Sequence, residues 1–189
     1  MDHVWRSLLL AAVSMMLLHG CTFAVESSSG EARVVEIPDF DLVLTHPADW
    51  YLAEESLTPN LGDPREVFSL GTFPLRSGGP NCDQVPSQAL HDLGVTDVFV
   101  TLQERRGADP LGFDQRPDNF GPLPGSTDTE FYDCLEPEER ADIGTMHWIW
   151  FTDQERYFHV LVANGRDAAP ESVSAIWSTL DQLVIEPRE

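Results

Sequence analysis

Lysine is absent from this sequence of 189 residues, and its 11 basic residues are all arginine. A Schiff-base mechanism and a P-loop nucleotide site both need a lysine ammonium group, so both are excluded. The 32 acidic residues leave a formal net charge of −21. A surface this negative repels phosphate backbones and anionic lipid headgroups, so we expect no nucleic-acid partner. Solubility or adaptation to salt explains the charge, and attraction of cations or of a basic protein is the alternative.

The motifs that mark common catalytic sites are also missing. The sequence contains no Gly-x-Ser-x-Gly nucleophile elbow, no His-Glu-x-x-His zinc motif, no EF-hand loop and no glycine-rich dinucleotide fingerprint after a strand. None of these common catalytic motifs therefore marks an active site, and we expect no cofactor. The alternative is a small hydrolase that uses carboxylates or His147.

The sequence offers two kinds of weak candidate metal site. His147 and His159 lie on the two strands of an expected hairpin, and two histidines without a third ligand bind zinc or copper weakly. Three groups of acidic residues could hold calcium or form a carboxylate pair, but such groups are expected by composition alone in a chain this acidic. The acidic groups are Asp114/Asp118, Asp128/Glu130/Asp133 and Glu136/Glu138/Glu139. We therefore predict no metal site.

An apolar run of 11 residues near the amino terminus, residues 8–18, is too short to span a bilayer and has the length of the apolar region of a signal peptide. It ends in Leu18-His19-Gly20-Cys21, which resembles the cleavage box of bacterial lipoproteins. The resemblance implies cleavage before Cys21 and attachment of diacylglycerol to its thiol. An ordinary cleaved signal peptide and an uncleaved anchor are the alternatives.

These features predict three parts of the chain and a location. Residues 1–20 form the signal peptide, residues 21–32 form a small, serine-rich, flexible tether, and residues 33–189 form a single domain. We expect the protein on the extracytoplasmic face of the cell membrane, held there through the lipid on Cys21.

Cysteine is scarce as well, since the sequence has only three. Once Cys21 is lipidated, Cys82 and Cys134 remain, and an isolated pair in an oxidising compartment predicts a disulfide. Because this bridge would close about 51 residues, it would stabilise the fold by roughly 4 kcal/mol through restriction of the unfolded chain.

The pattern of apolar residues predicts an α+β fold, with a mostly antiparallel sheet of about six or seven strands packed against two helices. A hairpin with a three-residue loop at residues 153–155 is the strongest signal. This loop would place His159 opposite Ile149, with His147 on the same face, and a shift of one residue would separate the two histidines. Strands are expected at 34–37, 42–44, 66–73, 95–103, 146–152, 156–163 and 183–185, and helices at 88–93, capped by Ser87, and 170–180.

An early strand ending in Pro-x-x-Trp (Pro47 to Trp50), a late aromatic hairpin, and then a helix and a last strand resemble the PsbP-like fold, over residues 34–187. The layout is also similar to that of bacterial surface lipoproteins. The resemblance implies an accessory or binding module without catalysis, and it identifies no ligand. A regulatory or sensory partner of another envelope protein is an alternative function.

A long segment rich in glycine and proline, residues 107–128, is the expected interaction surface, because function concentrates in long loops that a rigid scaffold holds. Within it, Phe113, Arg116 and Phe120 are the residues predicted to contact a partner.

Overall fold

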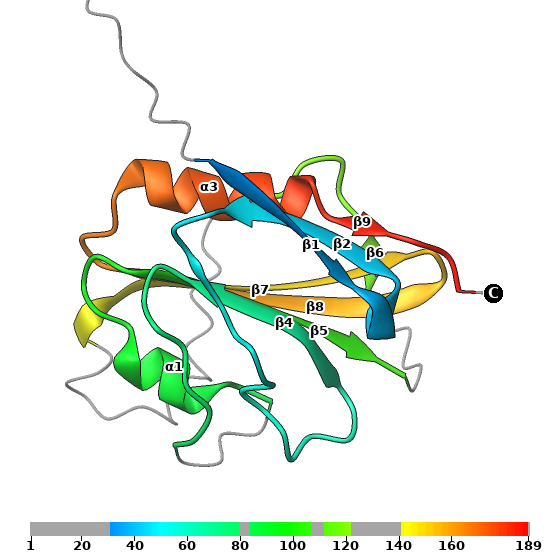
Figure 1. Ribbon diagram of the computed structural model, residues 1–189, viewed down its shortest axis with the longest axis horizontal. Coiled ribbons are helices and arrows are strands. Elements are labelled where there is room, and N and C mark those ends of the chain that lie inside the picture. Colours follow the sequence, from blue (N-terminus) through cyan, green and yellow to red (C-terminus); the bar gives the residue numbers. More distant parts are fainter. Residues whose placement is uncertain (1–30, 80–83, 107–111, 122–140, 189) are drawn as a thin grey trace, which may run out of the picture.

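The computed structural model describes residues 31–79, 84–106, 112–121 and 141–188. In these residues the chain forms nine strands and two α-helices (Figure 1). The predicted α+β class is confirmed. The expectation of one sheet of six or seven strands is wrong, because the described strands lie in two sheets, of six and of three.

The large sheet has the strand order β3-β4-β5-β8-β7-β6. Its neighbouring strands are antiparallel except β6 and β7, which are parallel. The predicted strand at 95–103 lies inside the sheet but begins three residues later, at Val98. The strands are β3 (Tyr51–Leu52), β4 (Arg65–Gly71), β5 (Val98–Arg105), β6 (Asp114–Gln115), β7 (Ile143–Asp153) and β8 (Arg156–Gly165).

The β7–β8 hairpin is confirmed, but its register differs from the prediction by one residue. Asp153 pairs with Arg156, so the turn contains only Gln154 and Glu155. Both have positive φ, 49° and 58°, which is typical of a type I′ turn and matches the twist of the strands. Trp150 is therefore the residue opposite His159, and His147 and His159 lie on opposite faces of the sheet.

The small sheet, of β1 (Ala32–Ile37), β2 (Leu42–Pro47) and β9 (Val184–Ile185), was not predicted as a separate unit. A 3-10 turn, η1 (Pro38–Phe40), joins β1 to β2. Burial alternates along β2, so Leu42, Leu44 and His46 all point towards the interior.

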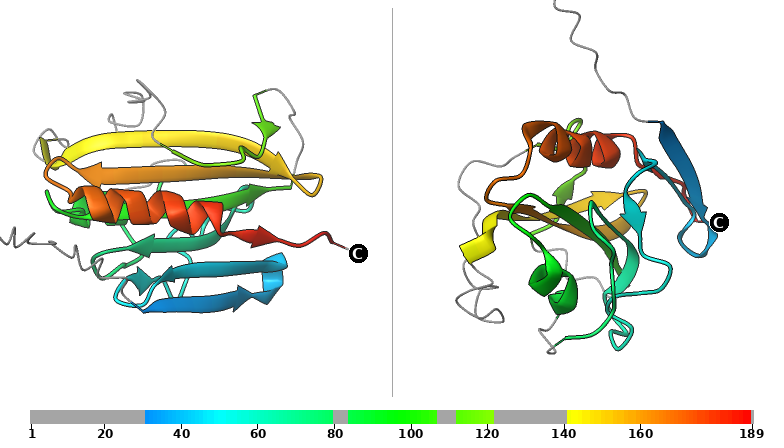
Figure 2. Two further views of the ribbon diagram at one scale, coloured as in Figure 1. Left: turned by 90° about the horizontal axis from the view of Figure 1, so that it is seen from above. Right: turned by 60° about the vertical axis from the view of Figure 1, so that its left-hand side comes forward.

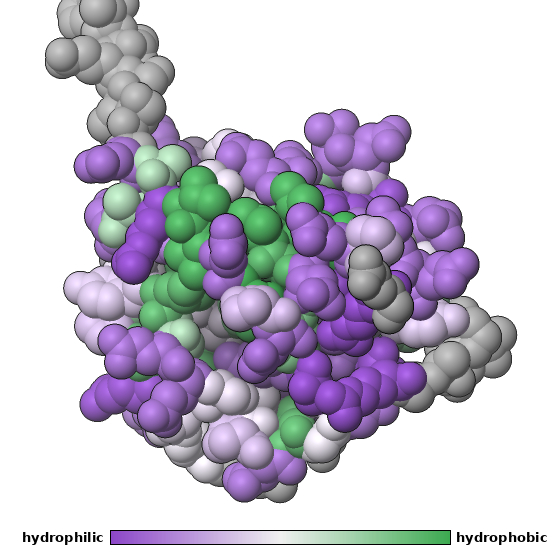
Figure 3. Space-filling view, turned by 45° about the vertical axis from the view of Figure 1, so that its right-hand side comes forward, coloured by the Kyte–Doolittle hydropathy of each residue, from purple (hydrophilic) through white to green (hydrophobic). Residues whose placement is uncertain are grey.

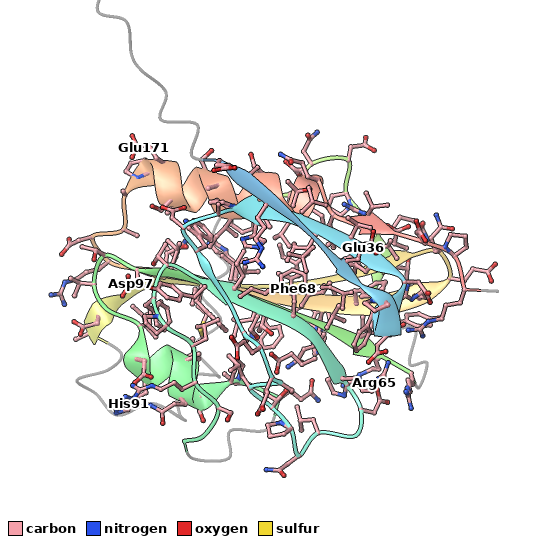
Figure 4. The ribbon with its side chains drawn as sticks, viewed as in Figure 1. Glu36, Arg65, Phe68, His91, Asp97 and Glu171 are labelled. Atoms are coloured by element: carbon pink, nitrogen blue, oxygen red, sulfur yellow. The ribbon has the colours of Figure 1, made fainter. Side chains whose placement is uncertain are left out.

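Helix α3 (Pro170–Asp181) lies with the small sheet on one face of the large sheet, and α1 (Ser87–Asp92) lies on the other face (Figure 2). Figure 4 shows Phe68 of β4 in the middle of this arrangement. The first core joins Phe68, Phe151 and Phe158 to Trp177 of α3, and the second joins Phe99 and Leu161 to Leu90 of α1. Since both faces are covered, β5 and β8 are buried almost along their whole length.

Both predicted helices form, with small differences at their ends. The C-terminal helix was predicted at 170–180 and to cover the sheet, which is confirmed. Ser87 is the first residue of α1 and not its cap, because Pro86 takes the cap position and no side chain caps the helix.

Candidate functional site

The three residues predicted to contact a partner all make contacts within the chain. Arg116 pairs with Asp153 (Nη1–Oδ2, 3.0 Å) and donates to the carbonyl oxygen of Leu180. Phe120 is buried against Phe151, with ring centroids 5.4 Å apart. These contacts fasten residues 112–121 to the hairpin and to the end of α3.

Phe113 stands edge-on to the ring of Tyr157, with centroids 5.4 Å apart. The described part of the 107–128 segment thus contains a short strand, β6, and anchored side chains. The binding role of this segment stays a prediction.

Several predicted features lie outside the described residues: the signal peptide and most of the tether, Cys21, Cys82 and Cys134, and the acidic groups between 128 and 139. Of the tether, residues 31 and 32 are described, and Ala32 already belongs to β1. Among residues that the structure describes, no group of three or more His, Cys, Asp or Glu side chains could hold a metal ion.

His147 and His159 are both buried, in different surroundings. His147 stands edge-on to Trp177, with ring centroids 5.7 Å apart, between the sheet and α3, and burial lowers its pKa. His159 stacks on Trp148 on the far face, at 5.2 Å. Burial, and to a smaller extent Arg105, lowers the pKa of His159 to about 4. The register therefore does not bring these two histidines together as a metal site.

The structure shows another candidate site, a hollow of about 830 Å³ between the end of β2 and the outer side of α3. Figure 1 shows the end of β2 lying below the middle of this helix. Volumes of this size are typical of small-molecule sites. The hollow lies outside the segment that the sequence predicted as the interaction surface.

His46 lies in the wall of this hollow and is only 2% exposed. Its Nδ1 is 2.8 Å from the carbonyl oxygen of Pro47. Because a carbonyl oxygen can only accept, Nδ1 carries the proton, and Nε2 of the neutral ring is an acceptor. Burial lowers the pKa of His46, the Pro47 bond acts in the opposite direction, and Arg33 adds to the lowering. The ring is therefore neutral at pH 7.

Nε2 of His46 is buried and has no hydrogen-bond partner. A buried acceptor left without a donor costs roughly 1–3 kcal/mol.

Hydroxyl groups of α3 line the opposite wall of the hollow. The helix turns Ile176, Trp177 and Leu180 inwards, and this leaves Ser178 and Thr179 at the hollow. Gln182, directly after the helix, adds an amide group. The α3 wall can thus both donate and accept hydrogen bonds.

Trp50 and two carboxylates complete the surroundings. A turn closed by the bond from Trp50 N to Pro47 O, 3.2 Å, brings the half-buried indole to the hollow. Asp49 and Glu171 are exposed at the rim, and Figure 4 shows Glu171 at the start of α3. No arginine is among the residues that line the hollow in the described part of the chain.

Sequence reasoning missed the hollow and His46 in its wall. Its alternation with Leu42 and Leu44 could have placed it inside. The missing partner of Nε2 depends on the packing of α3 against β2, for which the sequence carries no signal.

A second surface feature is the outer face of the small sheet, where Val34 is 64% and Val184 is 50% exposed. Figure 3 shows an apolar area on this side, next to the point where the described chain begins. Scattered exposed valines are ordinary on a protein surface. The hollow is therefore the stronger candidate.

Comparison with protein-family models, with curated proteins and with solved structures finds no match to this chain. Among the described residues, no helix combines the length and the apolar character that crossing a membrane requires.

Proposed function

We propose that this protein is a lipid-anchored binding or accessory module on the extracytoplasmic face of the cell membrane, and that it binds its ligand in the hollow beside His46. One observation carries the binding role: a hollow of about 830 Å³ whose lining brings together the half-buried indole of Trp50 and the hydroxyl groups of Ser178 and Thr179.

The anchor is supported by the sequence alone. The apolar run at residues 8–18 and the box Leu18-His19-Gly20-Cys21 support export and lipidation at Cys21. The same export would place Cys82 and Cys134 in an oxidising compartment, which favours their disulfide.

A binding role is favoured over catalysis by the surroundings of His46. A general base must reach the proton that it removes, and Nε2 of His46 is buried with almost no accessible surface. The atom that orients Nδ1 is the Pro47 carbonyl oxygen and not a carboxylate that could stabilise an imidazolium.

A PsbP-like arrangement is the finer fold that we propose. The Pro47 to Trp50 turn after β2, the β7–β8 hairpin, α3 and β9 follow each other in the expected order. In such a module the proposed hollow lies directly beside the Pro-x-x-Trp turn.

The anchor is tested by fractionation of a bacterium that expresses the full chain. We expect the wild type in the membrane fraction, with a diacylated Cys21 at its amino terminus by intact mass and a loss of two protons for the disulfide. Cys21→Ser should prevent lipidation, while Cys82→Ser should leave lipidation intact. A wild-type chain with residues 1–20 uncleaved and free thiols in the cytosol would contradict this part.

The binding site is tested by a fragment screen with ligand-observed NMR on the full chain. Ser178→Trp fills the hollow from its exposed rim, and Thr96→Trp places the same bulk in an exposed turn elsewhere. Fragments that bind the wild type and the Thr96 variant should fail to bind the Ser178 variant. A screen without hits, or with hits that Ser178→Trp retains, counts against the hollow.

A further inference from the structure

The outer face of the small sheet carries little charge for a chain this acidic. Leu42, Leu44 and Ile185 turn towards the core, so the residues that alternate with them along the three strands turn away from it. Glu36, labelled in Figure 4, is the only charged residue among the outward ones, although 23% of the whole chain is charged. The outward residues are Ala32, Val34 and Glu36 of β1, Val43, Thr45 and Pro47 of β2, and Val184 of β9.

The valines on this face are neighbours. Val43 pairs directly with Val184, and Val34 lies diagonally from Val43 across the β1–β2 pair, where side chains are still within reach of each other. Val34 is 64% and Val184 is 50% exposed, so the rest of the chain leaves them open to solvent. One exposed valine is ordinary, whereas adjacent ones form a continuous apolar area, which Figure 3 shows.

The described chain begins at the edge of this face (Figure 1). β1 starts at Ala32, eleven residues after Cys21, which is the proposed site of the lipid. Eleven residues span at most about 40 Å when fully extended. The lipid would therefore keep the small sheet close to the bilayer. A contact between two tethered surfaces needs little affinity of its own, because the tether makes their effective concentration high.

Charge limits what can cover the face. The exposed carboxylates of Glu36, Asp39 and Glu186 outnumber the two arginines on or beside these strands, Arg33 and Arg188. With a net charge of −21, the molecule is repelled by anionic headgroups and by a second copy of itself. Lipids with zwitterionic headgroups avoid this repulsion.

We propose that the outer face of the small sheet, around Val34, Val43 and Val184, rests on the bilayer that holds the lipid of Cys21, and that this contact favours zwitterionic lipids. The inference rests on the proposed lipid anchor and adds the surface through which the domain meets the membrane. Because the apolar area is small, the contact depends on the anchor and does not hold the protein on a membrane by itself.

Fluorescent labels at two positions test which face meets the lipid. The full chain is expressed in a bacterium, purified from its membrane and reconstituted in phosphatidylcholine vesicles that contain a nitroxide-labelled lipid. Val34→Cys and His91→Cys each supply a thiol for a polarity-sensitive dye, at side chains with similar exposure, 64% and 56%. The unsubstituted chain, treated with the same dye, gives the background from Cys82 and Cys134.

The dye at position 34 should be quenched by the nitroxide and its emission should shift to the blue. The dye at position 91 should keep its emission. His91 lies on α1, beyond the large sheet from the small one (Figure 2), and so about 20 Å further from the membrane at the usual spacing of about 10 Å between layers.

A charge on the apolar face should weaken the contact. Val184→Glu places a carboxylate beside Val43 and should reduce the quenching at position 34. Thr96→Glu adds the same charge in an exposed turn and should not. Vesicles of phosphatidylglycerol should also reduce the quenching. The Cys21→Ser chain, which has no lipid, should not bind either kind of vesicle.

The possible failures can be told apart. A wild-type chain without lipid on Cys21 would overturn the proposed anchor. A lipidated chain in the vesicles with an unquenched dye at position 34, or with equal quenching at positions 34 and 91, would overturn the membrane contact and leave the anchor standing. A blue shift at position 34 without quenching would show that a second copy of the chain, and not lipid, covers the face.

Discussion

Arg156 connects three parts of the molecule through one buried guanidinium group. Its Nε donates to Glu104 of β5 at 2.8 Å, its Nη2 donates to the carbonyl oxygen of Phe40 at 2.8 Å, and its Nη1 donates to that of Glu186 at 3.3 Å. Both side chains of the ion pair are less than 10% exposed. Arginine suits this position because its planar fork can serve several acceptors at once.

Replacing Arg156 by methionine should lower the free energy of unfolding by about 3 kcal/mol, since Glu104 would lose a buried partner. Arg188 also contacts Glu104, at 2.9 Å, and limits the loss. The matched control is Arg166→Met, because the Arg166–Asp142 pair is about half exposed and should contribute less than about 1 kcal/mol. Urea unfolding of the two variants checks this, and equal losses would show that burial does not decide the effect.

His159 predicts a pH dependence of stability. Its pKa of about 4 in the folded protein lies below the unfolded value of about 6.5. Between these two pH values His159 is protonated in the unfolded chain but neutral in the folded protein. Stability should therefore fall as the pH drops from about 6.5 towards 4. Protonation of His159 alone should lower the free energy of unfolding by about 2 kcal/mol between pH 7 and pH 4.5.

Urea unfolding at pH 7 and pH 4.5 tests this. His159→Phe can still stack on Trp148 but cannot take up the proton, so it should lose about 2 kcal/mol less than the wild type over this interval. His91→Phe removes an imidazole that is 56% exposed and lies 3.4 Å from Asp92, so it should change the dependence much less than the His159 variant does. A His159 variant with an unchanged acid loss would show that other groups control it.

Among the secondary-structure elements, prediction succeeded where a local pattern determines the result. The spacing of Val173, Ile176, Trp177 and Leu180 marks one helix face, and α3 forms there. The hairpin strands were also found from their β-branched and aromatic residues. The register failed, because Gln154 and Glu155 are not the asparagine and glycine that usually identify a two-residue turn.

That mismatch gives a prediction for the turn. Changing Gln154→Asn together with Glu155→Gly should raise the free energy of unfolding by about 1 kcal/mol, because both new residues adopt positive φ at lower cost. Glu155→Gln removes the same charge without relieving the backbone and is the control. A urea midpoint that does not rise above that of the control would contradict the assignment of strain to this turn.

The small sheet was missed for a different reason. The pattern of residues 34–37 and 42–44 shows that they are strands, but strand propensity does not say which sheet a strand joins. The pairing of β2 with β9 joins Leu42 to Ile185, residues far apart in the sequence. Only the shape of the folded core selects this pairing. The site shares this limit, since the neighbours of His46 come from α3.

For the whole molecule, the net charge of −21 is the dominant property. Like charges repel one another in the compact state, and dissolved salt screens this repulsion. The urea midpoint should therefore rise between 20 and 500 mM NaCl, and KCl should give the same result at equal ionic strength. A midpoint that falls with salt would mean that ion pairs such as Arg116–Asp153 outweigh the repulsion.

Helix α3 has two sides with different tasks: Ile176 and Leu180 belong to the first core, and Ser178 and Thr179 belong to the hollow. A molecule seated in the hollow would contact a helix whose position depends on the whole core being assembled. Occupancy and folding are then thermodynamically linked, and a ligand at 100 times its dissociation constant would add about 2.7 kcal/mol to the unfolding free energy. A rise in the melting temperature of the protein would therefore reveal which crude extract contains the natural ligand, before the chemical structure of that ligand is known.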